Sequence, residues 1–205
     1  MQLFEAINKR RSIRKFKNQP VPVEDLKFLV ECATKAPSAH NKQKWKFIAV
    51  TNKELNDRCS EAVSDKIDQL VRKYNITESV QGWKYYSTFF NSAPAVIYVF
   101  HQEARGFLDK AVGDKISREE INRLRVHPGI QSIGGAIENL LLAATVKGYG
   151  TCWMTAPNVA APEIEKILEI EEPWQLAAVI PVGVPAENPQ ARPRKPLEEV
   201  FEVKE

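Results

Sequence analysis

The chain has 205 residues, of which 43% are hydrophobic, and this is enough to bury one core, so a single domain spanning residues 1–205 is predicted. Its 29 basic and 26 acidic residues give a net charge of +3, which argues against binding to nucleic acid or to an anionic membrane surface. No apolar run approaches the roughly 20 residues that cross a bilayer, and the N-terminus lacks a signal-peptide pattern, so a cytoplasmic location is expected.

The first quarter of the chain is predicted to contain two helices, a loop and a strand. Apolar residues at helical spacing indicate a short helix over residues 3–9 and an amphipathic helix over residues 23–33. The second helix ends before the proline that opens the polar loop 37–43, because a residue preceding proline is pushed out of the helical region. Aromatic and β-branched residues then alternate over residues 45–51, which predicts a strand.

The second quarter begins with a polar segment, residues 52–74, whose pattern is helical. A turn-prone link leads to a segment crowded with aromatic residues. These aromatic side chains either pack in the core or line a pocket for a substrate, and the sequence leaves both readings open. They are Trp83, Tyr85, Tyr86 and Phe89, and the adjacent Lys84 is a candidate for a cation in such a pocket.

A compact apolar strand is predicted over residues 95–100, and a charged excursion over residues 101–128 follows it. Within the excursion, Ser117 and Glu120 have the spacing of a capping box, which marks the start of a helix. The excursion therefore resembles an insertion with its own helix.

The last part of the chain is predicted to contain a long helix from about residue 130, a short strand over 151–155, a helix over 161–170 and an apolar strand over 176–184. The glycines at 148–150 end the long helix. Helices and strands intermix without a regular βαβ rhythm, which favours an α+β fold. The long helix is apolar around most of its circumference, so it needs burial on several sides. Its apolar residues are Ile133, Ala136, Ile137, Leu140, Leu141, Leu142, Ala143, Ala144 and Val146.

Cysteine and histidine usage gives no sign of a metal site. Cys32, Cys59 and Cys152 are odd in number and form no C-x-x-C pair, and the three histidines show no ligand spacing. The chain also lacks the G-x-S-x-G and G-x-x-x-x-G-K-[ST] motifs of serine hydrolases and phosphate loops. Metal-dependent and covalent hydrolytic chemistry are therefore not expected.

Two short arginine clusters lie at opposite ends of the chain, R-R-S-I-R at residues 10–14 and R-P-R-K at residues 192–195. Arginine donates two parallel hydrogen bonds to phosphate oxygens and remains ionised, so the clusters would form a phosphate cradle if the fold brings them together. Taken singly, each cluster also fits a solvated surface. The neighbouring Ser12, Pro193 and Pro196 favour the cradle because they restrict backbone and hydrogen-bond geometry.

Four segments together resemble the nitroreductase family of FMN-dependent oxidoreductases. The segments are R-R-S-I-R-K-F at 10–16, A-P-S-A-H-N-K-Q-K-W at 36–45, G-Y-G-T-C-W at 148–153, and I-P-V-G-V-P followed by R-P-R-K-P-L-E-E at 192–199. The resemblance runs essentially from end to end. It implies a mixed, mainly antiparallel sheet flanked by helices, and a homodimer with two FMN molecules at the subunit interface. The long apolar helix would then be buried by a second subunit, the alternative being the central helix of a monomer.

The resemblance also implies roles for individual residues. Arg10, Arg11, Ser12, Arg192 and Arg194 would hold the phosphate and ribityl chain of FMN, and Arg14 would reach the pyrimidine edge of the flavin. Pro37, Ser38, Ala39 and Asn41 would contact the flavin from the other subunit, although their loop also reads as an ordinary self-capping loop. Met154, Thr155 and Ala156 would lie along the flavin ring, with a backbone N–H of Thr155 or Ala156 donating to it.

The activity implied by the resemblance is transfer of a hydride from NADH or NADPH through flavin N5 to a nitroaromatic, a quinone or a similar small acceptor. This chemistry is centred on the flavin and requires no catalytic side chain. The alternatives are a specialised flavin enzyme of the same fold, either a reductive dehalogenase or a flavin-fragmenting enzyme, and a non-catalytic flavin-binding or anion-binding protein. RNA binding is disfavoured because no aromatic-plus-glycine RNA-binding motif is present.

Overall fold

The computed structural model describes residues 1–103 and 106–205. Four strands form one sheet in the order β1-β2-β4-β3, and each neighbouring pair of strands is antiparallel. A parallel bridge between Ser12 and Thr151 adds the N-terminal segment beside β3. The predicted α+β class with a mixed, mainly antiparallel sheet is therefore confirmed. The strands are β1 (Trp45–Val50), β2 (Ala95–His101), β3 (Gly150–Thr151) and β4 (Gln175–Gly183).

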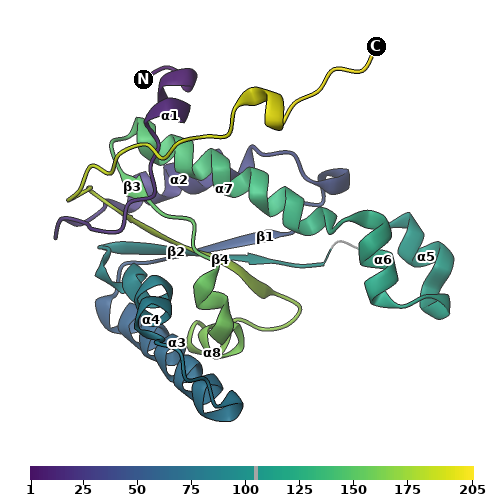
Figure 1. Ribbon diagram of the computed structural model, residues 1–205, viewed down its shortest axis with the longest axis horizontal. Coiled ribbons are helices and arrows are strands. Elements are labelled where there is room, and N and C mark those ends of the chain that lie inside the picture. Colours follow the sequence, from purple (N-terminus) through teal and green to yellow (C-terminus); the bar gives the residue numbers. More distant parts are fainter. Residues whose placement is uncertain (104–105) are drawn as a thin grey trace.

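Both faces of the sheet are covered by helices, which gives three layers (Figure 1). The helices α2 (Val23–Thr34) and α7 (Pro128–Val146) cover one face. The helices α3 (Lys53–Tyr74) and α8 (Ala161–Ile167) cover the other, together with the 3-10 turn η2 (Phe89–Ser92). Because both faces are buried, β2 is largely apolar from Ala95 to Phe100 and does not alternate between apolar and polar residues.

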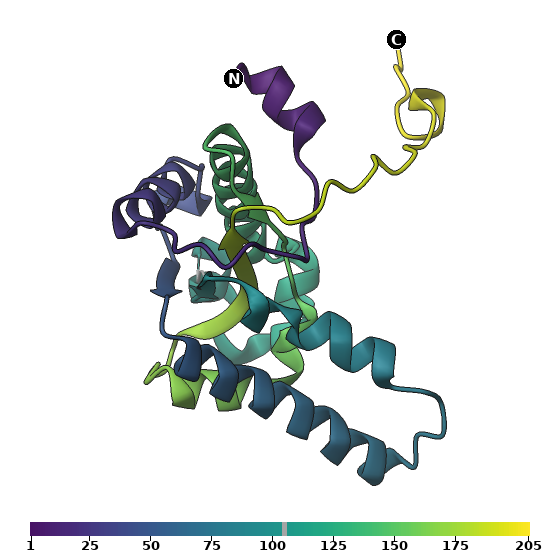
Figure 2. The ribbon, with the colours of Figure 1, turned by 90° about the vertical axis from the view of Figure 1, so that its left-hand side faces the viewer.

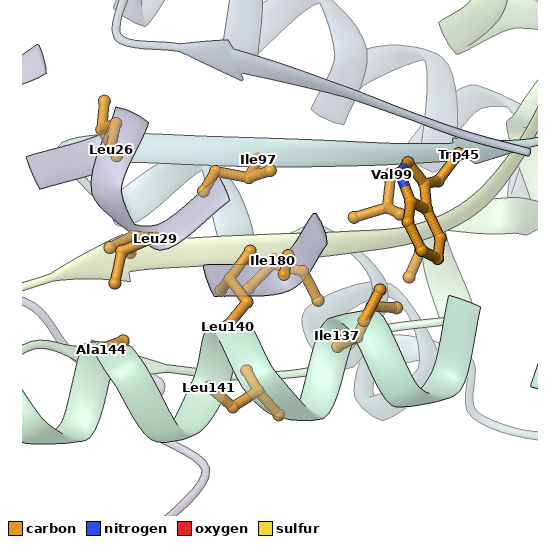
Figure 3. Packing of buried hydrophobic residues seen from close by; sticks show 14 of the residues in the cluster. Leu26, Leu29, Trp45, Ile97, Val99, Ile137, Leu140, Leu141, Ala144 and Ile180 are labelled. Atoms are coloured by element: carbon orange, nitrogen blue, oxygen red, sulfur yellow. The ribbon is translucent and has the colours of Figure 1, made fainter. Parts of the chain in front are cut away.

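Alternate residues of each strand enter different hydrophobic clusters, since successive side chains of a strand point to opposite faces. In β2, Ile97 and Val99 face α2 and α7, whereas Tyr98 and Phe100 face α3. Figure 3 shows the first cluster, in which α7 contributes Leu140, β4 contributes Ile180 and α2 contributes Leu29. The buried residues of this cluster are 0 to 9% exposed, so they form a continuous core on this face of the sheet.

Helices α1 (Leu3–Lys9) and α2 lie where the sequence predicts them, and so does α3, which Asn52 caps by accepting a hydrogen bond from the Leu55 N–H. The loop 37–43 contains one 3-10 turn, η1 (Ala39–Asn41). The aromatic segment forms α4 (Gln81–Thr88), which continues into η2. At the C-terminal side of α7, Gly148 has φ of 84°, the left-handed conformation expected of a glycine that ends a helix.

Three predicted boundaries are wrong. The expected strand over 151–155 is reduced to β3 and a single antiparallel bridge between Met154 and Val179, because residues 156–160 turn into the 3-10 helix η4 (Ala156–Ala160). The helix expected over 161–170 ends at Ile167, and Glu169 then has φ of 55°, outside the right-handed helical region. The long helix begins at Pro128, two residues before the predicted start at about residue 130. Proline suits this first position because the N–H of a first helical residue has no hydrogen-bond partner within the helix.

The charged excursion over residues 101–128 carries two helices, α5 (Phe107–Val112) and α6 (Arg118–Arg125), and a short 3-10 turn, η3 (Gly113–Lys115). Ser117 Oγ accepts the Glu120 N–H at 3.1 Å, as the predicted cap requires. Ala104 and Arg105 of this predicted insertion lie outside the described residues.

The long helix α7 obtains much of its burial from its own chain. Six of its apolar residues are buried beneath the sheet and α2, among them Ile137, Leu140 and Ala144. Leu142 and Ala143 are half-buried, and Val146 is exposed. Among the described residues, no helix is long and apolar enough to cross a membrane.

Candidate functional site

The two arginine clusters line one cavity of about 570 Å³. Five arginines face it, three from the N-terminal segment and two from the C-terminal tail. Its charged lining also includes one acid from the middle of α7. The lining includes Arg10, Arg11, Ser12, Arg14, Glu138, Arg192 and Arg194. Both arginine clusters therefore meet at one cavity within a single chain, as a phosphate cradle requires.

A short antiparallel ribbon between residues 14–17 and 184–187 brings the two clusters together. Lys17 N–H donates to the Val184 carbonyl at 2.8 Å, and Ala186 N–H donates to the Lys15 carbonyl at 2.9 Å. Figure 2 shows the N-terminal segment in purple passing beside the yellow tail as the tail leaves the sheet. Because β4 is anchored in the core, this ribbon determines where the tail carries its arginines.

The side chain of Glu187 strengthens the ribbon. Its Oε1 accepts the backbone N–H of Arg14 at 2.6 Å and that of Lys15 at 3.2 Å. The carboxylate comes from 173 residues away in the sequence. A charged acceptor makes a stronger hydrogen bond than a neutral one, so Glu187 is a firm tie between the two chain ends.

The guanidinium groups are only partly satisfied by the protein. Arg11 Nη1 donates to the carbonyls of Asn8 and Arg10 at 2.6 and 2.8 Å. Arg10 Nε lies 3.6 Å from Glu138 Oε1, with the Arg10 side chain 24% exposed and Glu138 47% exposed. These contacts engage few of the five N–H donors that each arginine carries, so the remainder can bind an anion in the cavity.

Arg14 differs from the other arginines because an aromatic ring covers it. Its Nη1 donates to the Ser12 carbonyl at 3.2 Å, and its Cζ lies 5.9 Å from the centre of the Tyr86 ring in α4. The Nε of Arg14 is buried without a hydrogen-bond acceptor among the residues that the structure describes. A buried donor left unsatisfied costs free energy, which marks this atom as one that a ligand acceptor would satisfy.

A third expected segment, residues 150–156, adjoins the cavity. Ile13 N–H donates to the Thr151 carbonyl at 2.9 Å. Gly150 is required there because an added Cβ would lie 2.7 Å from Ile13 Cγ1. Behind the arginines, burial raises the pKa of the Cys152 thiol, while the nearby Arg14 opposes that change. Cys152 is therefore a neutral packing residue at neutral pH.

The residues expected along the flavin ring lie just beyond this contact. Met154 is buried and exchanges backbone hydrogen bonds with Val179. Thr155 and Ala156 begin the turn η4, with Thr155 exposed and Ala156 half-buried. The backbone N–H groups at the start of such a turn have no partner within it, so they are available as donors.

The fourth expected segment lies elsewhere. Pro37, Ser38, Ala39 and Asn41 are near the N-terminal end of α7, where Ala39 N–H donates to Ser132 Oγ at 3.2 Å. None of them lines the arginine cavity. A single chain therefore brings two of the four predicted segments to the cavity and ties a third, residues 150–156, to the first by a backbone hydrogen bond. The prediction that this loop reaches the site from another subunit stays a prediction.

The aromatic residues of α4 and η2 divide into two groups. Phe89 is buried, and Trp83 is half-buried against the cluster that contains α3, so both are packing residues. Tyr85 and Tyr86 are 48% and 56% exposed, and the Tyr86 ring lies over Arg14. Lys84 Nζ lies 2.7 Å from an Asp68 carboxylate oxygen, so it pairs α4 with α3. Trp83 and Phe89 therefore pack in the core, and the pocket reading stays a prediction for Tyr85 and Tyr86.

A second, larger cavity of about 1140 Å³ lies at the opposite end of the sheet. It mixes cations, among them Lys44 and Arg125, with acids, among them Glu165 and Glu172. His101 also lines it, and burial lowers the pKa of this imidazole. None of the residues expected at the functional site faces this cavity.

Sequence reasoning missed two acids that contact the first arginine cluster, Glu138 inside the cavity and Glu187 in the ribbon. Glu138 had a usable signal, since it is a lone acid within an otherwise apolar run of the long helix. Glu187 had none, because its role depends on a contact with backbone atoms far away in the chain. No cluster of three or more metal-ligating side chains occurs in the part of the chain that the structure describes.

Comparison with known proteins gives the family. The family model described as Nitroreductase family matches residues 7–184. The chain belongs to the nitroreductase family. That match covers the first arginine cluster and all four strands of the sheet.

Relatives within the nitroreductase family differ in activity. An iodotyrosine deiodinase of Thermotoga neapolitana is 27% identical over 97% of this chain and 95% of its own length. The crystal structure of a BluB-like flavoprotein from Clostridium difficile 630 is 33% identical, covers 100% of both chains and has a TM-score of 0.90. The FMN- and NADPH-dependent nitroreductase NfnB of Sphigopyxis sp. strain HMH is 18% identical, covers 100% of both chains and has a TM-score of 0.74. The last likeness shows the shared fold alone.

Proposed function

We propose that this chain is an FMN-dependent oxidoreductase that transfers a hydride from NADH or NADPH to a small acceptor such as a nitroaromatic or a quinone. The observation that carries the proposal is the convergence of both arginine clusters on one cavity. The BluB-like flavoprotein, which is 33% identical over the whole chain, supports it.

The residues present fit FMN in three respects. Four guanidinium groups, those of Arg10, Arg11, Arg192 and Arg194, suit a phosphate monoester, which carries nearly two negative charges at neutral pH. Ser12 adds a hydroxyl on the same wall. The unsatisfied Arg14 Nε provides a donor for a carbonyl oxygen or ring nitrogen at the edge of the flavin.

Each residue has a role consistent with flavin chemistry. The bound flavin would accept a hydride from the nicotinamide, oxidising it, and then deliver two electrons to the acceptor. Arg10, Arg192 and Arg194 would anchor the phosphate and thereby orient the ring. Arg14 would stabilise the negative charge that reduction places on the ring, in a partly buried site where water screens charge weakly. The N–H groups of Thr155 and Ala156 would donate to the opposite edge.

We also propose that the functional unit is a homodimer. Pro37, Ser38, Ala39 and Asn41 are remote from the arginine cavity of their own chain, so they would contact flavin only across a subunit interface. Exposed apolar side chains on α1 and the tail support an interface. Phe4 is 78% exposed, and Phe201 is 60% exposed. Exposed apolar residues of this size at both chain ends indicate a partner surface.

A second candidate is a specialised flavin enzyme of the same fold, such as a reductive dehalogenase. It is favoured by the iodotyrosine deiodinase of Thermotoga neapolitana, which matches this chain almost from end to end. Such an enzyme would use the same phosphate cradle but would react poorly with nicotinamide and only with a dedicated substrate.

The deciding experiment is spectroscopic. We expect the protein purified with FMN to be yellow, to lose its flavin absorbance on anaerobic addition of NADH or NADPH, and to regain it when a nitroaromatic or quinone is added. A flavin spectrum that NADH and NADPH leave unchanged but dithionite bleaches would favour the specialised enzyme. A protein that takes up no FMN would contradict both candidates.

A further inference from the structure

Two separate segments of the chain contact Arg14, one at its backbone and one at its guanidinium group. Its backbone is tied by Glu187 of the tail, and its guanidinium lies against Tyr86 of α4. We propose that Glu187 and Tyr86 are positioning residues that hold Arg14 as a fixed cation and so set the redox potential of the bound flavin. The inference rests on the proposed function, because it concerns the same site.

Glu187 determines where the Arg14 backbone lies. One oxygen of its carboxylate accepts N–H groups from two successive residues, at 2.6 and 3.2 Å. A single acceptor shared by two consecutive N–H groups restricts both peptide units, because each must point to the same atom. The ribbon hydrogen bond from Ala186 to Lys15 then fixes the position of Glu187 itself along the tail.

Tyr86 determines where the guanidinium lies. A guanidinium within about 6 Å of an aromatic centre is attracted by the electron-rich face of the ring, and the Arg14 Cζ is at 5.9 Å. The ring also excludes water from one side of the cation, since Arg14 is half-buried while Tyr86 is 56% exposed. α4 is itself held against α3 by the Lys84–Asp68 pair.

A held cation and a mobile cation act differently on a neighbouring charge. A mobile arginine reorients into water, and its field at the ring is screened. A held arginine needs no reorganisation when charge appears, so it favours the reduced ring more strongly. Loss of either holding residue is therefore expected to lower the midpoint potential while the flavin stays bound through its phosphate.

Tyr86 gives the cleanest test because its exposed side chain can be replaced without opening the core. We expect Tyr86→Ala to shift the ratio of reduced to oxidised flavin about threefold, or about 15 mV for a two-electron couple. Tyr86→Phe keeps the ring face and should restore the wild-type potential. Tyr74→Ala is the matched control, since Tyr74 is an exposed tyrosine on α3 that contacts Lys73 at 5.1 Å.

Glu187 supplies the second arm. We expect Glu187→Ala to lower the potential in the same direction, and Glu187→Gln to restore most of it, because the amide oxygen can accept the same N–H groups. Thermal unfolding of the FMN-bound protein shows whether each variant is folded. If Glu187→Ala does not fold, Glu187→Gln and the Tyr86 variants carry the test.

The decisive comparison uses Arg14→Ala as the background. If Tyr86 acts through Arg14, Tyr86→Ala should have no further effect on the potential once Arg14 is removed. Equal shifts in both backgrounds, or no shift from Tyr86→Ala in the wild-type background, would overturn the inference. A protein that binds no FMN would instead overturn the proposed function, so the two failures are distinguishable.

Discussion

The larger and the smaller of the cavities described above differ in volume and in charge pattern. The larger one, about 1140 Å³, sets Lys44 and Arg125 among acids such as Glu165 and Glu172. The smaller one, about 570 Å³, gathers five arginines with the single acid Glu138. Cations interspersed with acids neutralise one another, whereas a surplus of one sign attracts an opposite ligand. The smaller cavity therefore suits an anion better than the larger one, because of its charge and in spite of its volume.

Removing arginines should give the largest effect and sharpen this contrast. We expect Arg10→Ala and Arg192→Ala each to weaken FMN binding about 10- to 100-fold, since each removes a charge-assisted hydrogen bond to phosphate. The measurement is the dissociation constant from quenching of flavin fluorescence.

Lys44→Ala, in the larger cavity, is the matched control for these variants. Lys44 Nζ contacts Gln102 Oε1 at 2.7 Å and faces no residue of the arginine cavity. Its replacement should leave FMN affinity within about twofold. Comparable losses from Lys44→Ala and Arg10→Ala would break the distinction between the cavities.

Overpacking behind the arginine cavity should have the next largest effect. Gly150→Ala would place a Cβ 2.7 Å from Ile13, and crowding of this kind costs about 1–3 kcal/mol. Because Ile13 lies between Ser12 and Arg14, FMN affinity should fall together with stability to urea. Gly82→Ala, where nothing lies within 4 Å, should leave FMN affinity unchanged.

The acid of the arginine cavity provides a smaller test. Glu138 competes with phosphate for Arg10, so Glu138→Gln should tighten FMN binding about two- to fivefold, the range expected for a half-exposed ion pair. Glu172→Gln in the larger cavity should change nothing. A weaker affinity of Glu138→Gln for FMN would show that the carboxylate supports the site and does not oppose the phosphate.

The smallest effect is expected for a change of stability at Asp25, which lines neither of these cavities. Asp25 of α2 accepts from Lys147 at 2.6 Å and from the Tyr149 hydroxyl at 2.5 Å, and these contacts, Lys147 first, lower the Asp25 pKa. A lowered folded-state pKa contributes stability above the ordinary value of about 4, and that stability is lost as the pH falls. Between pH 5 and pH 2 we expect the melting temperature of wild type to approach that of Asp25→Asn. A gap that widens in acid would contradict this sign.

Much of the fold was predictable because its signals are local. The apolar runs of β2 and β4 are long enough to be recognised on their own, and Gly148 marks the end of α7. β3 was overestimated because a strand of two residues has no periodicity to detect. After β3 only Met154 pairs with β4, through a bridge to Val179, and the chain turns into η4 directly after Thr155.

The site was predictable only in part, for the same physical reason. Arginine clusters are visible in the sequence, but the contacts of Glu187 with Arg14 and of Tyr86 with Arg14 join residues that are far apart in the chain. Neither contact leaves a local pattern. The loop 37–43 is the opposite case. Its motif is clear in the sequence and predicts contact with the flavin, but within one chain the loop does not line the arginine cavity.

The most direct test is a crystal structure of the protein grown with FMN. The account predicts phosphate oxygens within hydrogen-bond distance of a guanidinium from residues 10–14 and of another from residues 192–194. A phosphate held by one chain end alone, or FMN bound in the larger cavity, would contradict it.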